Sequence, residues 1–186
     1  MPQSFDDRAV YARRSLGSLL LDEAADEIGD TVSLTVRSGL ETVCVARRLG
    51  SYPIQVRSMG IGVRRPIGVS SSSIAILSTL TKREALQIVR QNGGRFDDTK
   101  VTIDEIMEKV ERARACEYAF LERGLVHGTR ALSIPIRSRK GPACATLTVT
   151  AITRRIPQQR VNSIVDVLRG CAVKMADLIS HEAASR

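Results

Sequence analysis

Residues 128–150 read GTRALSIPIRSRKGPACATLTVT, and they predict an antiparallel pair of strands. Two β-prone runs, 130–137 and 143–150, flank the polar connection SRKGP at 138–142. A short polar segment with Gly and Pro between two such runs is typical of a hairpin. Because successive side chains of a strand point to opposite faces, Thr148 and Thr150 are expected on the same face.

Toward the N-terminus, three more strands are predicted. Residues 31–37 alternate Val and Leu with Thr and Ser, which is the period of a half-buried strand. The turn Ser38-Gly39 follows, and the runs 43–49 and 54–58 add two further β-prone segments. Three consecutive strands predict an antiparallel meander. The expected total is five strands.

Helices are predicted before, between and after these two groups of strands. The first has apolar residues at helical spacing and ends at Gly29. Two others begin with the capping-box strings TKRE at 81–84 and TIDE at 102–105. The expected helices cover 10–28, 70–80, 81–92, 102–118 and 161–179, with Pro157 near the start of the last.

This order of elements predicts one α+β domain with a mainly antiparallel sheet and flanking helices. The chain has 186 residues, 43% of them hydrophobic and 26% charged, and no Pro-, Ser- or Gly-rich linker divides it. Its aromatic content is 3%, so the core must be aliphatic and few rings are available to stack on bases. The net charge of +8 favours an anionic partner, but scattered Arg doublets are also typical of a solvated surface.

The four cysteines, at 44, 116, 144 and 171, are too far apart in sequence for a C-x-x-C metal motif. Buried packing is the expected role of each. A zinc site that combines His127 with distant cysteines is the alternative, and no metal or other cofactor is predicted. No apolar run spans a bilayer and no signal peptide is present, which predicts a cytoplasmic protein without a membrane partner.

Four strings, taken in order, resemble the C-terminal effector-binding domain of IclR-family transcriptional regulators. They are EIGDTVSLTV at 27–36, GVRRPI at 62–67, SSSSIAILSTL at 70–80 and GTRALSIPI at 128–136. Together they extend the resemblance over nearly the whole chain. The resemblance implies a GAF- or profilin-like curved sheet whose pocket binds a small organic effector, an acid or an aromatic compound.

The resemblance also implies partners. The family forms homodimers and homotetramers, and it contacts DNA through a winged helix-turn-helix module that normally precedes this domain and is absent from this chain. Residues 1–15 are expected to be a residual linker or helix start, and residues 16–186 the effector-binding sensor domain. Ligand binding is then expected to modulate DNA binding through the arrangement of subunits.

Part of the expected pocket comes from the glycine-rich segment and the helix that follows it. Gly60 and Gly62 allow backbone N–H groups to approach a ligand, and Arg64 or Arg65 could hold a carboxylate. Neighbours on an extended segment point opposite ways, so only one of the two arginines can face inward. Ser70 begins the helix, whose first turn carries partial positive charge.

The rest of the expected pocket comes from the hairpin. Thr148 and Thr150 match positions where the family has hydroxyls facing the ligand, although threonine on a strand can also simply face solvent. Ala131 stands where members that bind small acids often have a cysteine. Two further departures are Ser73-Ile74 in place of a usual Gly-Lys pair and Gly124 in place of an acidic residue. These changes weaken the expectation of an acidic ligand.

Three other functions stay open at this point. The chain could be a free-standing ligand-binding domain. It could be a hydrolase that uses a serine of 70–73 as nucleophile, which would need a base within hydrogen-bond reach. The structural alternative is that Ser70 caps the helix and the other serines are small residues that allow close packing. Direct nucleic-acid binding by the basic surface is the third, and it predicts a steep dependence on salt. The favoured hypothesis is a sensor domain that is not an enzyme.

Overall fold

The computed structural model describes residues 7–96, 101–137 and 141–184, with side chains described between residues 18 and 177. Within these ranges the helices are α1 (Asp7–Ile28), α2 (Ser71–Leu77), α3 (Lys82–Gln91), α4 (Ile103–Cys116) and α5 (Gln158–Ala184), with short 3-10 turns at Gly93–Arg95 and Thr153–Arg155. The strands are β1 (Thr31–Ser38), β2 (Glu41–Arg48), β3 (Arg64–Pro66), β4 (Ala119–Leu121), β5 (Thr129–Ile136) and β6 (Ala145–Ile152).

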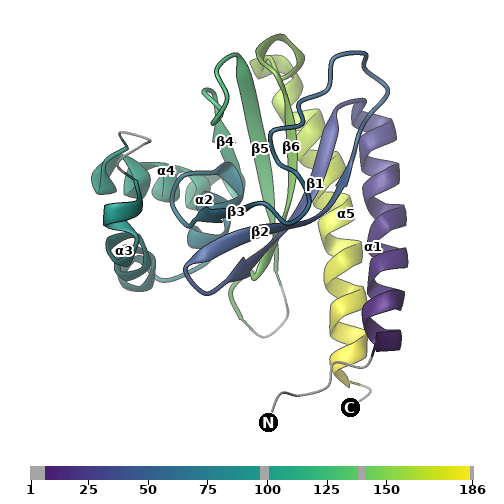
Figure 1. Ribbon diagram of the computed structural model, residues 1–186, viewed down its shortest axis with the longest axis horizontal. Helices are drawn as coiled ribbons and strands as arrows, with labels where there is room; N and C mark the ends of the chain where they lie inside the picture. Colours follow the sequence, from purple (N-terminus) through teal and green to yellow (C-terminus); the bar gives the residue numbers. More distant parts are fainter. Residues whose placement is uncertain (1–6, 97–100, 138–140, 185–186) are drawn as a thin grey trace.

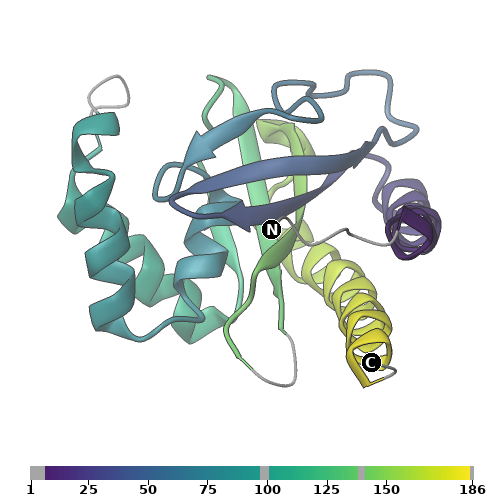
Figure 2. The same ribbon diagram turned by 60° about the horizontal axis from the view of Figure 1, so that its bottom comes forward.

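The six strands form one curved sheet in the order β3-β2-β1-β6-β5-β4, and every neighbouring pair is antiparallel. Helices α1 and α5 lie side by side on one face, while α2, α3 and α4 lie on the other (Figure 1). Figure 2 shows the curvature of the sheet between these two groups of helices. The predicted α+β class and curved antiparallel sheet are confirmed.

The face of the sheet toward α1 and α5 is apolar. Alternate residues of the central strands, among them Val32, Leu147, Val149 and Leu132, are fully buried against Leu21 and other side chains of the two helices. Along each strand, every second residue points toward α1 and α5, as the two-residue period of a strand requires. Burial of this aliphatic layer supplies the main driving force for packing of the two long helices.

The opposite face is covered by α2, whose seven residues are all buried. Ile74 and Leu77 of α2 pack against α3, α4 and the Ile67 region in a second aliphatic core. This core is contiguous with Phe96 and Ile106, so α2 lies between the sheet and the outer helices. A helix that is buried on all sides and begins with three serines after the N-cap Ser70 brings hydroxyl groups against the sheet.

The predicted helix boundaries rest on short-range signals that the structure confirms. α1 ends before Gly29, whose φ of +78° is in the region that favours glycine. Both expected capping boxes form, with Thr81 and Glu84 at the start of α3 and Thr102 and Glu105 at the start of α4. The helix expected to reach residue 118 ends at Cys116, where Glu117 is left-handed.

The predicted strand at 54–58 is wrong. This segment is irregular, and Gln55 there donates its side-chain amide to Gly29 O (3.1 Å) and Tyr52 O (2.6 Å). The third strand is instead β3, which pairs with β2. A further short strand, β4, was not predicted, so the sheet has six described strands and not five. Residues 138–140 of the predicted hairpin connection lie outside the described residues.

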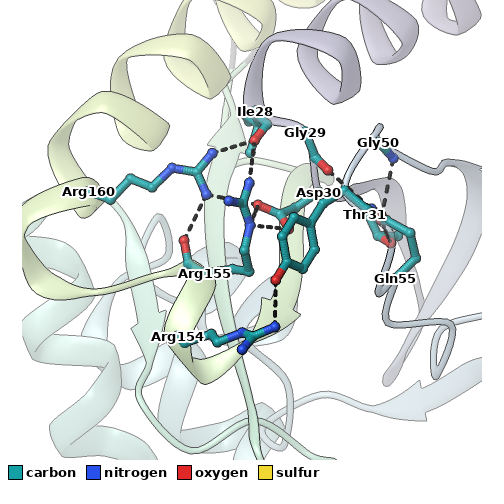
Figure 3. A network of polar contacts seen from close by, with 10 residues as sticks. Ile28, Gly29, Asp30, Thr31, Gly50, Gln55, Arg154, Arg155 and Arg160 are labelled. Atoms are coloured by element: carbon teal, nitrogen blue, oxygen red, sulfur yellow. Dashed lines mark hydrogen bonds and ion pairs between the residues drawn. The ribbon is translucent and has the colours of Figure 1, made fainter.

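A buried ion-pair network joins the end of α1 to the start of α5 (Figure 3). Asp30, which is 1% exposed, accepts from Arg155 Nε at 3.0 Å and from Arg160 Nη1 at 2.8 Å. The Arg155 guanidinium also lies 4.2 Å from the centre of the Tyr52 ring. The network therefore fixes the 49–63 segment, which carries Tyr52, against the junction of both long helices.

Candidate functional site

A small, partly open cavity lies between α2 and the polar face of the sheet, and two connecting segments complete its wall. The β2–β3 segment contributes Ser58 and Met59, and the β4–β5 segment contributes Gly124 and Leu125. Its volume is about 30 Å³. That space suits roughly two water molecules. The full lining is Ser33, Thr35, Ser58, Met59, Ser70, Ser71, Ser72, Leu121, Gly124, Leu125, Thr129, Ala131, Thr148 and Thr150.

The cavity is lined mainly by hydroxyl groups because the strands are amphipathic and both of their faces are covered. In β1, Ser33 and Thr35 alternate with the apolar residues that face α1 and α5, and Thr148 does the same in β6. Such a polar face usually contacts water. Here α2 covers it, and Ser33, Thr35 and Thr148 are 3%, 1% and 6% exposed.

Most of these buried hydroxyls satisfy one another. Ser133 on β5 donates to Ser71 Oγ at 2.8 Å and lies 2.7 Å from Thr148 Oγ1. At the start of α2, Ser70 Oγ lies 2.8 Å from Ser72 Oγ and 3.2 Å from Ser73 Oγ. The network crosses from helix to sheet, so it determines the spacing of the two cavity walls.

Thr35 is the exception among the lining residues. Within the described part of the chain, no group hydrogen-bonds to its Oγ1 atom, which is buried. A buried hydroxyl without a partner costs about 1–3 kcal/mol. A ligand or a water in the cavity would supply the missing hydrogen bond.

Four of the predicted site residues come together at this cavity. Ser70, Ala131, Thr148 and Thr150 all line it. Thr148 is buried and Thr150 is half-buried, so the alternative that both threonines face solvent is wrong. Ser70 is also the N-cap of α2 and accepts from the backbone N–H of Ser73.

The predicted glycine-rich part of the pocket lies elsewhere. Gly60 and Gly62 are not among the lining residues, and Gly62 is exposed in the turn before β3. Arg64 is exposed and pairs with Glu41 at 2.5 Å. Arg65 donates to Met59 Sδ at 3.1 Å and Ser58 O at 3.5 Å, which places its guanidinium against the segment that walls the cavity.

The carboxylate of Glu41 explains why Arg64 points away from the cavity. Glu41 lies on β2 beside β3 and accepts from both Arg95 and Arg64. These two hydrogen-bonded guanidinium groups lower the pKa of Glu41 below its usual value. The charge of Arg64 is therefore matched at the outer edge of the sheet.

Gly124, where the family resemblance led us to expect an acidic residue, is required by close packing. Its backbone N–H donates to Thr129 O at 2.8 Å. A Cβ atom at this position would be 2.3 Å from Thr129 Oγ1. No side chain fits there without displacing the wall of the cavity.

Sequence reasoning missed the hydroxyls of Ser33, Thr35 and Thr129, and it treated Ser71 and Ser72 only as part of a serine run. The signal was present in the alternation of 31–36, which was interpreted as a half-buried strand with a polar side. What the alternation did not reveal is the helix that covers that side.

The lining offers hydrogen bonds but no acid–base group. No His, Asp or Glu occurs among the described lining residues, so the base that a serine nucleophile at 70–73 would need is not at the cavity. No cluster of three or more metal-ligating side chains was found in the described ranges.

The four cysteines are free thiols. Cys44 and Cys171 are buried, as expected for residues that pack in the core. Cys116 and Cys144 are exposed, so the expectation of buried packing was wrong for these two.

A second hollow, of about 990 Å³, lies between α3 and α4. It is open, and its lining mixes apolar side chains such as Leu86 and Met107 with charged ones of both signs, including Arg90 and Glu108. None of its residues is among the buried polar groups without a partner. The cavity between α2 and the sheet is therefore the better candidate site.

Comparison with known proteins agrees with this architecture. The sequence profile of the family described as bacterial transcriptional regulator IclR C-terminal matches residues 14–177. The chain belongs to this family. It is the kind of regulatory domain that transcriptional regulators of the IclR family carry, and the fold expected from the resemblance is confirmed.

The similar curated proteins are transcriptional regulators. KipR of Bacillus subtilis is 21% identical over 174 residues, which cover 90% of this chain and 68% of KipR. The transcriptional repressor AllR of Salmonella typhi is 26% identical over 146 residues, which cover 77% of this chain and 53% of AllR. The chain thus spans about half the length of AllR.

Solved structures share the fold at low sequence identity. IclR of Thermotoga maritima has a TM-score of 0.77 at 20% identity, over 94% of this chain and 69% of that one. A putative transcriptional regulator of Rhodococcus sp. RHA1 has a TM-score of 0.78 at 22% identity, over 91% of this chain and 68% of that one. Among the described helices, none is both long and apolar enough to cross a membrane.

Proposed function

We propose that this domain binds a small-molecule effector in the cavity between α2 and the hydroxyl-lined face of the sheet. The observation that carries the proposal is the buried Thr35 hydroxyl, which lines the cavity and has no partner among the described groups. A folded protein leaves few such groups unsatisfied. Occupancy by a ligand would complete the hydrogen bonding that the network of side chains leaves open.

The two segments at the cavity wall provide a route for entry. Met59 and Leu125 contribute apolar side chains to the lining, and Leu125 is 42% exposed. A ligand larger than about two water molecules must displace these segments outward, because the present volume holds no more. Binding is therefore coupled to a movement of the 49–63 segment, whose other end is fixed at the junction of α1 and α5 by Tyr52 and Gln55.

In a full-length regulator this movement would reach the DNA-binding module through α1. The ligand would change the arrangement of subunits in a homodimer or homotetramer, and the winged helix-turn-helix module would contact DNA accordingly. A ligand shifts such an equilibrium only by its different affinities for the two arrangements. The relatives named as transcriptional regulators support this role.

A thermal-shift screen tests the proposal. Carboxylates, keto acids, aromatic compounds, amides and polyols are added singly to the purified chain. A ligand at about one hundred times its Kd stabilises the folded state by about 2.7 kcal/mol, which for a chain of this size raises Tm by about 5–11 °C. A flat response to every class would contradict the proposal.

The variant Ala131→Val locates the binding. It adds two methyl groups to the cavity lining at a strand position, where a β-branched residue is well tolerated. We expect it to abolish the shift given by any active compound. The matched control is Ala46→Val on β2, a half-buried position outside the lining, which should keep the shift. Equal shifts in both variants would place the ligand elsewhere.

A further inference from the structure

The cavity contains no ionisable side chain, although the chain has a net charge of +8. Nine of its fourteen lining residues are Ser or Thr, and the other five are Met59, Leu121, Gly124, Leu125 and Ala131. Arg64 pairs with Glu41, and Arg65 donates to Met59 Sδ and Ser58 O. Arg130, which lies between two lining residues in sequence, donates to Ile156 O. A carboxylate in this cavity would lose its hydration without gaining a cation.

The direction of the hydrogen bonds tells which groups the cavity offers. A hydroxyl has one proton to donate. Ser133 uses its proton on Ser71, so Thr148 must donate to Ser133 in the 2.7 Å contact between them. On the helix, Ser73 Oγ already accepts from the backbone N–H groups of Gly68 and Ser70, and in the 2.8 Å contact between Ser70 and Ser72 either hydroxyl can donate.

Two kinds of group therefore face the cavity. Thr148 has used its proton within the network and presents only lone pairs, so it needs a donor from the ligand. Thr35 has no hydrogen-bond partner in the described part of the chain, and no described hydrogen bond uses the Ser71 proton, so these two can donate. A carboxylate is an acceptor only, and its oxygens would repel the lone pairs of Thr148.

We infer that the ligand of this cavity is an uncharged molecule that carries N–H or O–H donors beside an oxygen acceptor, of which a primary amide is the simplest example. The inference rests on the proposed function, because it concerns the same cavity. It replaces the acidic effector that the family resemblance suggested. The hydroxyl lining can donate to the carbonyl oxygen of an amide and accept from its NH₂ group, whereas a carboxylate has no proton to donate to the lining.

Isosteric pairs of probes separate charge from shape. Acetamide and acetate, glycolamide and glycolate, and lactamide and lactate are titrated into ¹⁵N-labelled chain and followed by amide chemical shifts. In each pair we expect the amide to perturb the backbone signals of Ser71, Ala131 and Thr148, with a Kd about tenfold or more below that of the carboxylate. This comparison uses the wild-type chain, so it does not depend on a variant that folds.

Two variants test the assigned groups, and two others serve as controls. Thr148→Val keeps the shape and removes the acceptor, and Ser71→Ala removes a donor; each should weaken amide binding about fivefold or more. Thr146→Val is the matched control, because Thr146 lies on the same strand and face, is 0% exposed, and is outside the cavity lining. Arg65→Gln should leave amide affinity unchanged.

The outcomes distinguish this inference from the proposed function. If carboxylates bind in the cavity as tightly as amides, or if Arg65→Gln abolishes binding, the inferred ligand class is wrong and the cavity remains an effector site. If neither member of any pair perturbs the signals around the cavity, both the inferred class and the cavity as effector site are contradicted. Preferential amide binding that Thr148→Val weakens and Thr146→Val preserves supports both.

Discussion

Replacement of Asp30 by asparagine tests how much the buried ion-pair network stabilises the fold. Both carboxylate oxygens of Asp30 accept hydrogen bonds, from Arg155 and from Arg160, and the residue is 1% exposed. Asp30→Asn keeps the shape of the side chain but removes its charge and one of its acceptors. Two guanidinium groups are then left beside a neutral amide.

The expected magnitude follows from the exposure of the two arginines. Loss of one partner from a fully buried ion pair costs about 3–5 kcal/mol. The side chains of Arg155 and Arg160 are 26% and 27% exposed, so both can recover part of their hydration when the charge of Asp30 is removed. We therefore expect a loss of about 2–4 kcal/mol, which lowers Tm by roughly 6–12 °C for a loss of about 3 kcal/mol.

The matched control is Asp22→Asn. Asp22 also pairs with an arginine, Arg48, but its side chain is 45% exposed and that of Arg48 is 36% exposed. Exposed pairs contribute about 0–1 kcal/mol, and salt screens them. Urea unfolding followed by circular dichroism, at low salt and at about 1 M NaCl, should give a large, salt-insensitive loss for Asp30→Asn and a small, salt-sensitive one for Asp22→Asn. Equal losses would refute the argument from burial.

Three other predictions concern backbone fit, capping and thiol reactivity. Gly50→Ala should lower the free energy of unfolding by about 3 kcal/mol, because its Cβ would be 2.1 Å from a backbone carbon of the α1–β1 turn. Gly170→Ala lies inside α5 with nothing within 4 Å of its Cβ and should raise the free energy of unfolding by about 0.5–1 kcal/mol. The urea midpoints of the two variants compare these effects. Hydrogen bonds from the N-cap threonine lower the pKa of Glu84 from 4.5, so its stabilising effect is present above that value and is lost as pH falls through the folded-state pKa. The stability difference between wild type and Glu84→Gln should therefore be smaller at about pH 3 than at about pH 7, and a constant difference would contradict it. Burial raises the pKa of the Cys171 thiol, so iodoacetamide should alkylate exposed Cys116 faster, as mass spectrometry of the peptides would show.

The parts of the fold that sequence predicted well depend on signals confined to a few residues. Gly29 ends α1, and the boxes that begin with Thr81 and Thr102 start α3 and α4 within one helical turn. Each signal combines a residue type with its own backbone hydrogen bonds, so it does not depend on distant packing. The end of α1 and the starts of α3 and α4 could therefore be located from the sequence alone.

The parts that failed depend on contacts between distant segments. Residues 54–58 have strand-like composition, but Gln55 hydrogen-bonds to Gly29, which is 26 residues away in sequence, and the segment crosses the helix junction instead of joining the sheet. β4 is only three residues long and is defined by its pairing with β5. Nothing in the local sequence distinguishes it from the end of a loop.

The site residues also divide into those located by local sequence patterns and those that depend on contacts between distant segments. The composition of the polar strand faces is a further signal that sequence analysis can use. Thr148 and Thr150 lie on one face, as the period of a strand predicts, and both line the cavity. Arg64, one of the two arginines expected at the pocket, lies outside the lining beside Glu41, which is its neighbour only in the folded sheet. The polar sides of β1 and β6 within 31–36 and 145–150 contain Ser and Thr but no charged residue. A strand face in water usually carries Lys, Arg, Glu or Asp, because these residues are rarely buried without a partner. Two neighbouring strands whose polar sides bear only hydroxyls therefore indicate a covered polar layer, and a covered polar layer requires either a closed network or a ligand to complete it.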